Sequence, residues 1–254
     1  LKSQINVMSI CVILNRSNIS EIDNICVDSL LSQTDILKNR LKNIINNKNT
    51  RLCFSADLEN PEKVIDILKK IGKYIAICKI HFDIFKFNEK YNKEKFKEDL
   101  INISHNDNFL LMEDRKFFDI SYIVDKQYSY FKNWIDLVTV HGMINDEVLK
   151  KISCGVLLVS DMSNNNYDIT DRCIELYKNN KNVIGLITQK KTKYKDLLKF
   201  TPGISTITNT IQDQKYRNIE NLKDDKPDII IVGRSIYNSA NVIEKVYELN
   251  TKFN

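Results

Sequence analysis

The chain has 254 residues, of which 43% are hydrophobic and 28% are charged. These values are ordinary for a globular domain, and the length is typical of a single α/β barrel. The 38 lysines and arginines against 33 aspartates and glutamates give a net charge of +5, spread along the chain. Such a charge suits a small anionic ligand as well as nucleic acid, and by itself it argues for neither. We expect no nucleic-acid partner.

The cysteines and histidines lack the spacing of a metal site. Six cysteines occur without a Cys-x-x-Cys pair, and most lie in apolar runs (Cys11, Cys26, Cys53, Cys78, Cys154 and Cys173). This pattern predicts free thiols in a reducing compartment, which indicates the cytoplasm. The apolar run Ile5–Leu14 is too short to span a membrane, so we interpret it as a strand and expect no membrane partner.

Residues 1–50 are predicted to form an N-terminal extension. After the first strand come a turn at Asn15–Asn18 and a second apolar run at Ile25–Leu31. Thr34–Ile45 is amphipathic and is followed by the polar linker Asn46–Thr50, which together predict a helix and its end.

From Arg51 onward, apolar runs alternate with helical segments. Asn60 is placed to cap a helix that has Pro61 at its first position and Gly72 just past its end. Further helices are predicted at Lys93–Ser104, Tyr122–Phe131, Asn145–Ile152, Thr170–Asn179, Tyr194–Leu198 and Ala240–Leu249. The eight predicted strands are Leu52–Asp57, Tyr74–Lys79, Phe109–Met112, Ile135–Val140, Gly155–Val159, Val183–Ile187, Phe200–Ile204 and Asp228–Val232.

Strict alternation predicts a parallel sheet, and eight repeats predict a closed (β/α)₈ TIM barrel over residues 51–254. A doubly wound open sheet is the alternative. Polar side chains gather at the carboxyl ends of the strands, where barrel enzymes hold their sites. They are Asp57, Lys79, Asp114, Lys116, His141, Ser163, Gly203 and Arg234.

Two patterns among these residues indicate chemistry. Asp114 and Lys116 are two apart, so on an extended strand their side chains point to the same side. Pro202-Gly203 and Gly233-Arg234 end the last two strands, where barrels commonly bind phosphate. Glycine allows backbone N–H groups to approach a phosphate, and arginine offers two parallel donors.

The chain resembles the orotidine 5′-monophosphate decarboxylase family from about Arg51 to its C-terminus. The resemblance is carried in the family's order by Ser55–Asp57, Lys79–Ile84, Glu113–Ile120, Thr201–Gly203, Gln214–Tyr216 and Asp228–Arg234. It implies decarboxylation of orotidine 5′-monophosphate to uridine 5′-monophosphate and CO₂ without a cofactor, the last step of de novo pyrimidine nucleotide synthesis.

The resemblance also implies roles for individual residues. The charged array of the family falls on Lys79, Asp114, Lys116 and Asp119, with Lys116 as the proton donor to C6. Asp119 would enter the site of a neighbouring copy, which implies a homodimer. Substrate contacts are implied for Ser55, Asp57, Lys79, His81, Ser163, Pro202, Gln214, Tyr216, Gly233 and Arg234.

Three departures from the family pattern bear on substrate binding. Ser121-Tyr122-Ile123 replaces the usual Gly-Asn-Thr, so a hydroxyl contact to the ribose is lost at Ile123. The loop after Ser163 is shorter than usual and lacks its glycines, and the loop from Ser205 to Asp213 lacks glycines too. We expect activity with weaker substrate binding.

A weaker resemblance covers residues 4–40. Ile10–Arg16 and Val27–Leu31 are similar to the end of an orotate phosphoribosyltransferase domain. This arrangement is similar to the bifunctional uridine monophosphate synthase of animals. The resemblance implies that this chain is the C-terminal domain of such a protein. The alternative is an unrelated extension.

Two other functions stay open at the level of sequence. A catalytically impaired nucleotide-binding member of the same family would explain the changes at Tyr122 and Ile123, but the intact charged array argues against it. A phosphosugar aldolase or epimerase with an Asp-x-Lys motif would lack the Gln-x-Tyr pattern. The aromatic residues Tyr128, Tyr130 and Phe131 are predicted to pack a helix rather than stack on bases.

Overall fold

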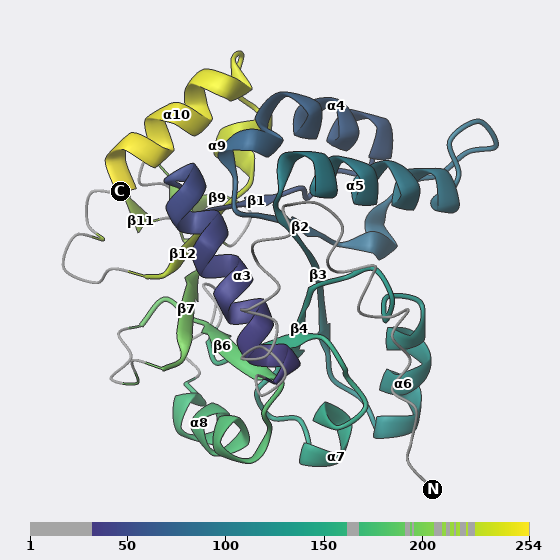
Figure 1. The fold of residues 1–254 in the computed structure, drawn as a ribbon, viewed down its shortest axis with the longest axis vertical. Helices are drawn as coiled ribbons and strands as arrows, with labels where there is room; N and C mark the ends of the chain where they lie inside the picture. Colours follow the sequence, from purple (N-terminus) through teal and green to yellow (C-terminus); the bar gives the residue numbers. More distant parts are fainter. Residues whose placement is uncertain are drawn as a thin grey trace, which may run out of the picture.

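The computed structural model describes residues 32–161, 168–190, 194, 196–205, 210–211, 214–215, 217–218, 222 and 227–253. Eight parallel strands form a closed barrel in the spatial order β1-β12-β7-β6-β5-β4-β3-β2 (Figure 1). They are β1 (Leu52–Ser55), β2 (Ile77–Ile80), β3 (Leu110–Phe117), β4 (Leu137–His141), β5 (Gly155–Val159), β6 (Val183–Ile187), β7 (Leu198–Thr201) and β12 (Ile229–Val232). The closed ring confirms the predicted (β/α)₈ barrel and excludes the open sheet.

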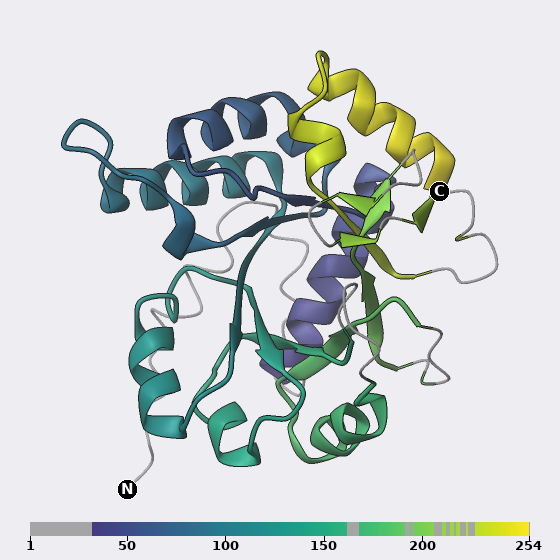
Figure 2. The ribbon, with the colours of Figure 1, turned by 180° about the vertical axis from the view of Figure 1, so that it is seen from behind.

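Helices cover the outside of the barrel (Figures 1 and 2). They are α4 (Pro61–Ile71), α5 (Lys93–Asp107), α6 (Ser121–Ser129), α7 (Asp146–Leu149), α8 (Thr170–Asn179), α9 (Arg234–Tyr237) and α10 (Val242–Phe253), with 3₁₀ turns η2 (Gly72–Tyr74) and η3 (Phe82–Ile84). Two short strand pairs follow β7, in which β8 (Ile204–Ser205) joins β11 (Arg217–Asn218) and β9 (Thr210–Ile211) joins β10 (Gln214–Lys215).

The local chemistry of the helix ends follows the sequence. The Asn60 side chain accepts from the backbone N–H of Lys63, and Pro61 occupies the first turn of α4. Gly72 ends α4, but its φ is −53°, so the left-handed conformation is not the reason for glycine there. A Cβ at Gly72 would lie 2.4 Å from an Asp107 carboxylate oxygen, so the Asp107 side chain at the end of α5 packs in the space that glycine leaves.

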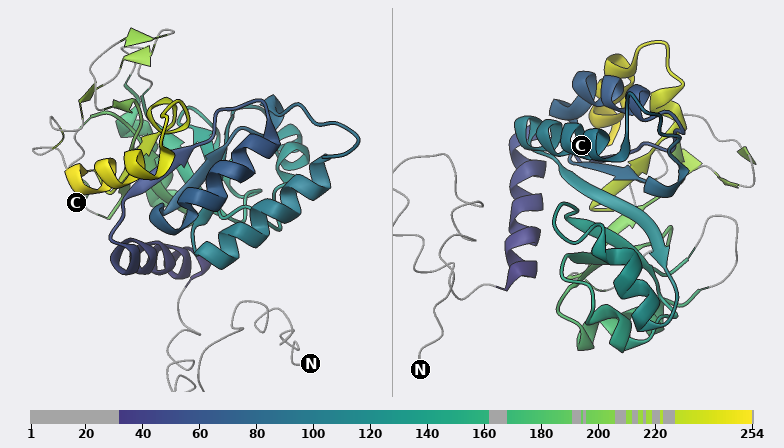
Figure 3. Two further views of the ribbon diagram at one scale, coloured as in Figure 1. Left: turned by 90° about the horizontal axis from the view of Figure 1, so that it is seen from above. Right: turned by 90° about the vertical axis from the view of Figure 1, so that its right-hand side faces the viewer.

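Helix α3 (Gln33–Lys48) lies across the end of the barrel at which the strands begin (Figures 1 and 3). Its buried residues Leu41 and Ile44 join the apolar cluster that fills the barrel interior. The Arg40 guanidinium donates to Asp136, just before β4, over 2.8 Å. The helix predicted at Thr34–Ile45 is thus confirmed, and it packs directly on the barrel. It continues to Lys48, so the first three residues of the linker predicted at Asn46–Thr50 are helical. The earlier predicted elements, Ile5–Leu14, the turn and Ile25–Leu31, lie outside the described residues.

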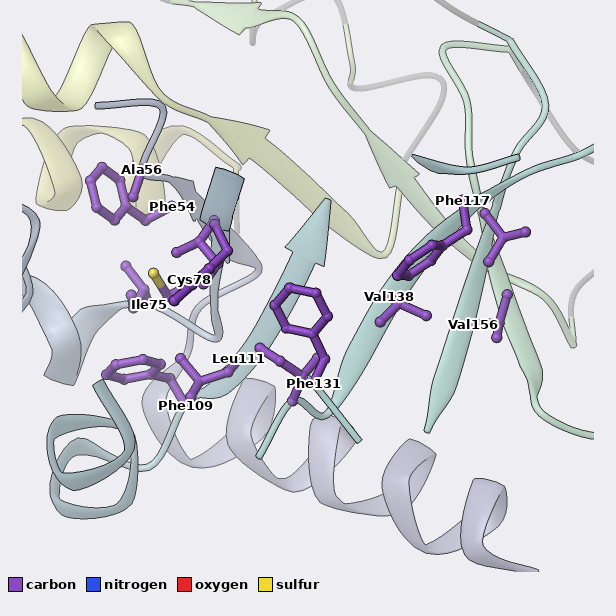
Figure 4. Packing of buried hydrophobic residues seen from close by; sticks show 14 of the residues in the cluster. Phe54, Ala56, Ile75, Cys78, Phe109, Leu111, Phe117, Phe131, Val138 and Val156 are labelled. Carbon is purple, nitrogen blue, oxygen red and sulfur yellow. The ribbon is translucent and has the colours of Figure 1, made fainter. Parts of the chain in front are cut away.

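A second apolar layer lies between the strands and the outer helices. Figure 4 shows part of it, with Phe54, Leu111 and Val138 projecting outward from three strands. Phe131 belongs to this layer and Tyr128 is buried beside it, as predicted for helix packing. Along β3 the two layers alternate, because Leu110 and Met112 face the interior while Leu111 faces the helices.

Two predictions about local structure need correction. The short helix expected at Tyr194–Leu198 is wrong, because Leu198 begins β7 and pairs with Gly185 of β6. The strand expected at Phe200–Ile204 therefore begins two residues earlier and ends at Thr201. Helix α9 follows β12 directly and was not predicted.

The cysteines of the described part carry free thiols. These are Cys53, Cys78, Cys154 and Cys173, as expected, whereas Cys11 and Cys26 lie outside the described residues. Within the same part of the chain, none of the helices combines the length and the apolar character needed to cross a membrane.

Candidate active site

A cavity of about 220 Å³ opens at the carboxyl ends of the barrel strands. Ten residues singled out from the sequence line it: Ser55, Asp57, Lys79, His81, Asp114, Lys116, Pro202, Gly203, Gly233 and Arg234. They come from strands far apart in the sequence, and the closed barrel brings them to one mouth. The structure thus assembles most of the predicted residues in one place.

Lys79, near the end of β2, is the centre of a buried charged array. Its ammonium donates to Asp114 Oδ2 at 2.8 Å and to Asp57 Oδ1 at 3.1 Å. The Lys79 side chain is only 6% exposed and that of Asp114 11%. Burial alone would lower the pKa of Lys79, but the two carboxylates outweigh it and raise that pKa above its usual value. Lys79 is therefore a permanent cation in this site.

Asp114 is shared between two lysines. Its Oδ1 accepts from the Lys116 ammonium at 2.9 Å, while Oδ2 accepts from Lys79. Burial alone would raise the pKa of Asp114, yet Lys79 and then Lys116 hold it well below the usual range. The carboxylate is thus ionised at any physiological pH, and Lys116, whose side chain is 33% exposed, faces the cavity mouth.

His81 and Ser55 complete the side of the array nearest Asp57. Burial, and then the charge of Lys79, lower the pKa of His81, so its imidazole is neutral and Nε2 accepts from the Lys79 ammonium at 3.1 Å. The Ser55 hydroxyl donates to Asp57 at 2.8 Å. Burial opposes ionisation of Asp57, but the nearby Lys79 outweighs it and lowers its pKa. This side offers an ionised carboxylate and an imidazole to a hydroxylated ligand.

Two glycine-containing turns form the wall next to Ser55 and Asp57, because β12 pairs with β1. Gly203 has φ of 71°, a left-handed conformation that glycine adopts without strain. A Cβ at Gly233 would lie 2.9 Å from the Ser55 carbonyl oxygen, so β12 and β1 can approach this closely only with glycine there. Arg234 begins α9 at the cavity edge. The wall combines close backbone approach with one guanidinium, which suits an anionic group.

Five predicted residues are not among those that line the cavity. One is His141, the last residue of β4. Asp119 is exposed beyond β3, and its carboxylate accepts from the Ile120 N–H at 2.7 Å. Ser163 and Tyr216 lie outside the described residues, as does the loop that follows Ser163. Gln214 belongs to β10 by its backbone, and its side chain is not described.

Three buried polar residues near the array were given no role from the sequence. Thr139 of β4 donates to Asp114 Oδ1 at 2.7 Å, and Asp161, beyond β5, lines the cavity and accepts from Thr188 Oγ1. Glu113 is fully buried behind β3, accepts from the Phe82 N–H at 3.1 Å, and has its pKa raised by burial to about 8. Thr139 follows the inward alternation of β4 two residues before His141, a signal that could have identified it.

No group of three metal-ligating side chains with suitable geometry occurs among the residues that the structure describes. The two carboxylates of the array, Asp57 and Asp114, instead hold the Lys79 ammonium between them. The array therefore presents two fixed ammonium groups and two fixed carboxylates to an anion bound in the cavity.

Comparison with known proteins gives a consistent result. Residues 50–249 match the profile of the family described as Orotidine 5′-phosphate decarboxylase / HUMPS. Orotidine 5′-phosphate decarboxylase of Debaryomyces hansenii is 30% identical over 227 residues, covering 78% of this chain and 82% of that protein. The protein of the same name from Saccharomycopsis fibuligera is 30% identical over 225 residues, covering 79% and 84%.

Solved structures show the same fold at lower identity. The orotidine 5′-monophosphate decarboxylase of Methanocaldococcus jannaschii, crystallised with the inhibitor BMP, has a TM-score of 0.61 and 19% identity, covering 80% of this chain and 98% of that one. The Pyrococcus horikoshii enzyme has a TM-score of 0.62 at 19% identity, with the same coverage of 80% and 98%.

Proposed function

The chain belongs to the orotidine 5′-phosphate decarboxylase / HUMPS family and is a decarboxylase of orotidine 5′-monophosphate, and from that premise we propose how its residues perform the reaction. The observation that carries the proposal is the Lys79–Asp114–Lys116 array at the cavity. Loss of CO₂ from C6 of the pyrimidine leaves an electron pair that no adjacent carbonyl can delocalise. Stabilisation therefore has to come from fixed charge.

Lys116 is assigned the central role. As the C6–carboxylate bond breaks, CO₂ leaves and the electron pair stays on C6, beside the Lys116 ammonium. That ammonium stabilises the carbanion and donates its proton to C6, giving uridine 5′-monophosphate. The partial exposure of Lys116 lets solvent return a proton to its amine before the next turnover.

Asp114 and Lys79 prepare this step. The Asp114 carboxylate holds the Lys116 ammonium and lies on the side where the substrate carboxylate would bind, so its charge favours departure of CO₂. Lys79 fixes Asp114 and extends the array to Asp57. Asp57, Ser55 and His81 are assigned to the ribose hydroxyls.

The phosphate and the base are assigned to the residues that follow β7 and β12 and to the loops near them. Gly233 and Arg234, with Gln214 and Tyr216, would hold the phosphate, while Pro202 packs beside the pyrimidine and Ser163 bonds its edge. Binding energy from the phosphate, remote from C6, can then orient the base against Lys116. No added cofactor or metal enters this sequence of steps.

The test is release of CO₂ from orotidine 5′-monophosphate by the purified protein without added metal. Turnover by the wild type and its loss in Lys116→Ala, with the folded state retained, are expected. Lys69→Ala, which removes an exposed lysine from α4, is the control and should match the wild type. Appreciable turnover by Lys116→Ala would exclude Lys116 as proton donor, and an inactive wild type would overturn the function itself.

We also propose that the active unit is a homodimer. Support comes from the exposed apolar side chains that surround Asp119, where Phe118 is 60%, Ile120 67% and Tyr122 65% exposed, with Met143 nearby at 49%. A second copy of the chain would cover this patch, and Asp119 of each copy would enter the cavity of the other.

Subunit mixing tests the shared site. Asp119→Ala and Lys116→Ala should each be inactive, while a remixed sample should regain activity, up to about a quarter of the wild type if subunits pair at random. A mixture that stays inactive although mixed dimers form would place Asp119 in its own chain's site.

Two further assignments concern the whole protein. We propose that residues 1–50 contain the end of an orotate phosphoribosyltransferase domain and a linker, which makes the natural protein bifunctional; the motifs at Ile10–Arg16 and Val27–Leu31 support this. An assay of the natural protein with orotate and phosphoribosyl pyrophosphate tests it. We place the enzyme in the cytoplasm because its described cysteines are free thiols, and cell fractionation checks the location.

A further inference from the structure

Strands β3 and β4 do not pair one residue to one at the charged array. Glu113 pairs with Val138, and the next pair is Phe117 with Val140. Between these pairs β4 contributes one residue, Thr139, while β3 contributes three, Asp114, Arg115 and Lys116. The ladder is therefore interrupted at the point where the two reactive side chains leave the strand.

The interruption strains the backbone at Lys116. Its φ is 51°, in the left-handed region, where a side chain with a Cβ is disfavoured. Its N–H, having left the regular ladder, donates instead to the Thr139 hydroxyl oxygen at 2.9 Å. Such conformations persist only when surrounding contacts hold them, and Thr139 supplies this contact.

The same hydroxyl also holds the Asp114 carboxylate. Thr139 Oγ1 donates to Asp114 Oδ1 at 2.7 Å, and that oxygen accepts from the Lys116 ammonium at 2.9 Å. Thr139 is fully buried in β4, so its position is set by the barrel. One hydroxyl thus fixes the Lys116 backbone and the carboxylate that orients the Lys116 side chain.

We propose that Thr139 is a positioning residue that holds the Lys116 ammonium where it can deliver its proton to C6. This inference deepens the proposed function and rests on it. Thr139 lines no part of the cavity, so it acts through Asp114 and Lys116 and not on the substrate. Removing its hydroxyl should therefore slow the chemical step and leave the binding of ligands in the cavity intact.

The experiment compares Thr139→Val with Thr139→Ser. Thr139→Val keeps the shape and removes the hydroxyl, and should lower kcat about 10- to 100-fold, the effect of one hydrogen bond to a charged group. KM, and the Kd of uridine 5′-monophosphate, should stay within about threefold of the wild type, because substrate contacts are unchanged. Thr139→Ser restores the hydroxyl and should recover most of kcat.

Thr50→Val is the matched control. Thr50 is also fully buried, donates to a side-chain oxygen of Asn250 at 2.7 Å and accepts from the Leu52 N–H, but lies at the opposite end of the barrel. Its loss should lower stability without changing kcat. If Thr139→Val does not fold, Thr139→Ala set against Thr139→Ser compares two small side chains that differ by the hydroxyl.

Each outcome decides between the alternatives. Wild-type kcat in Thr139→Val overturns the inference while leaving the proposed function in place. Loss of uridine 5′-monophosphate binding in step with kcat, with no recovery in Thr139→Ser, shows a general structural role and also overturns it. A wild type that releases no CO₂ overturns the proposed function and the inference together.

Discussion

The Lys79 ammonium and the Asp114 carboxylate are 2.8 Å apart, and both side chains are almost wholly removed from solvent. Removing Lys79 leaves Asp114 with only the partly exposed Lys116 as a lysine partner, and leaves Asp57 without its ammonium. We expect Lys79→Met to lower the free energy of unfolding by about 3–5 kcal/mol, because Asp114 and Asp57 would both lose a counter-ion. Urea denaturation monitored by fluorescence measures this.

Lys116→Met is the control for that experiment. Lys116 also pairs with Asp114, but a third of its side chain is exposed, and Lys79 would still neutralise the carboxylate. The expected loss is below about 1 kcal/mol. Equal losses of unfolding free energy in the two variants would contradict the assignment of Lys79 to stability and of Lys116 to reactivity.

Glu113 is expected to make stability depend on pH. Burial raises its pKa to about 8, whereas an exposed glutamate titrates near about 4.3. The folded state therefore retains a proton that the unfolded chain releases. The contribution of protonated Glu113 to the free energy of unfolding is fully present below about pH 4 and is lost as pH rises toward about 8. Over that window the loss reaches at most about 1.4 kcal/mol per pH unit.

Glu113→Gln tests this dependence. The glutamine amide oxygen can still accept from the Phe82 N–H, but the side chain no longer titrates. The free energies of unfolding of the two proteins, measured from about pH 5 to about pH 8, should diverge in favour of the variant as pH rises. Parallel curves would show that Glu113 ionises normally in the folded protein.

Gly233→Ala should weaken substrate binding and lower stability. The added Cβ would meet the Ser55 carbonyl oxygen at 2.9 Å and approach the Asp57 carboxylate, so β12 must move away from β1 at the cavity. Overpacking of this kind lowers the free energy of unfolding by about 1–3 kcal/mol, and displacement of the turn should lower kcat/KM as well. Steady-state kinetics should assign most of the change to KM, and an unchanged KM would contradict the assignment of this turn to the phosphate.

Lys48→Met should loosen helix α3 without affecting catalysis. The three N–H groups of the Lys48 ammonium lie among four backbone carbonyl oxygens within 3.2 Å, at helix ends and strand starts: those of Gly72, Ile75, Asp107 and Asn108. Leaving these acceptors without the cation should cost on the order of 2–4 kcal/mol. Hydrogen exchange in α3 should accelerate.

Lys42→Met is the control for the same helix, since Lys42 is exposed there. It should leave exchange unchanged, and both variants should keep the wild-type kcat. A change of kcat in either direction in Lys48→Met would show that the end of the barrel at which the strands begin is energetically coupled to the site.

The sequence predicted the barrel well because its strands are buried on both sides. The nearly continuous apolar runs, such as Val183–Ile187, stand out from the polar helices between them, and Pro61 and Asn60 locate a helix start without reference to the rest of the chain. The prediction failed at Tyr194–Leu198, where Leu198 pairs with Gly185 across the barrel. That contact is non-local and has no signature in the segment itself.

The candidate site was predicted unevenly for a related reason. Asp114 and Lys116 were expected to share a side from their spacing, and they do, but Lys116 reaches its position through a left-handed backbone. Nothing in Asp114–Lys116 signals this conformation, because its support comes from Thr139 on the neighbouring strand. Likewise, Asp161 is tied to Thr188 by strand neighbours that sequence order does not reveal.

Helix α3 has a consequence for how the molecule can be divided. The family match starts at residue 50, yet the helix that supplies Leu41 and Ile44 to the barrel interior ends at Lys48. A fragment truncated at the homology boundary would open the interior, including Ile77 and Leu110, to water. We therefore expect the smallest stable fragment to include α3 with its capping residue Ser32, since this helix closes the end of the barrel at which the strands begin.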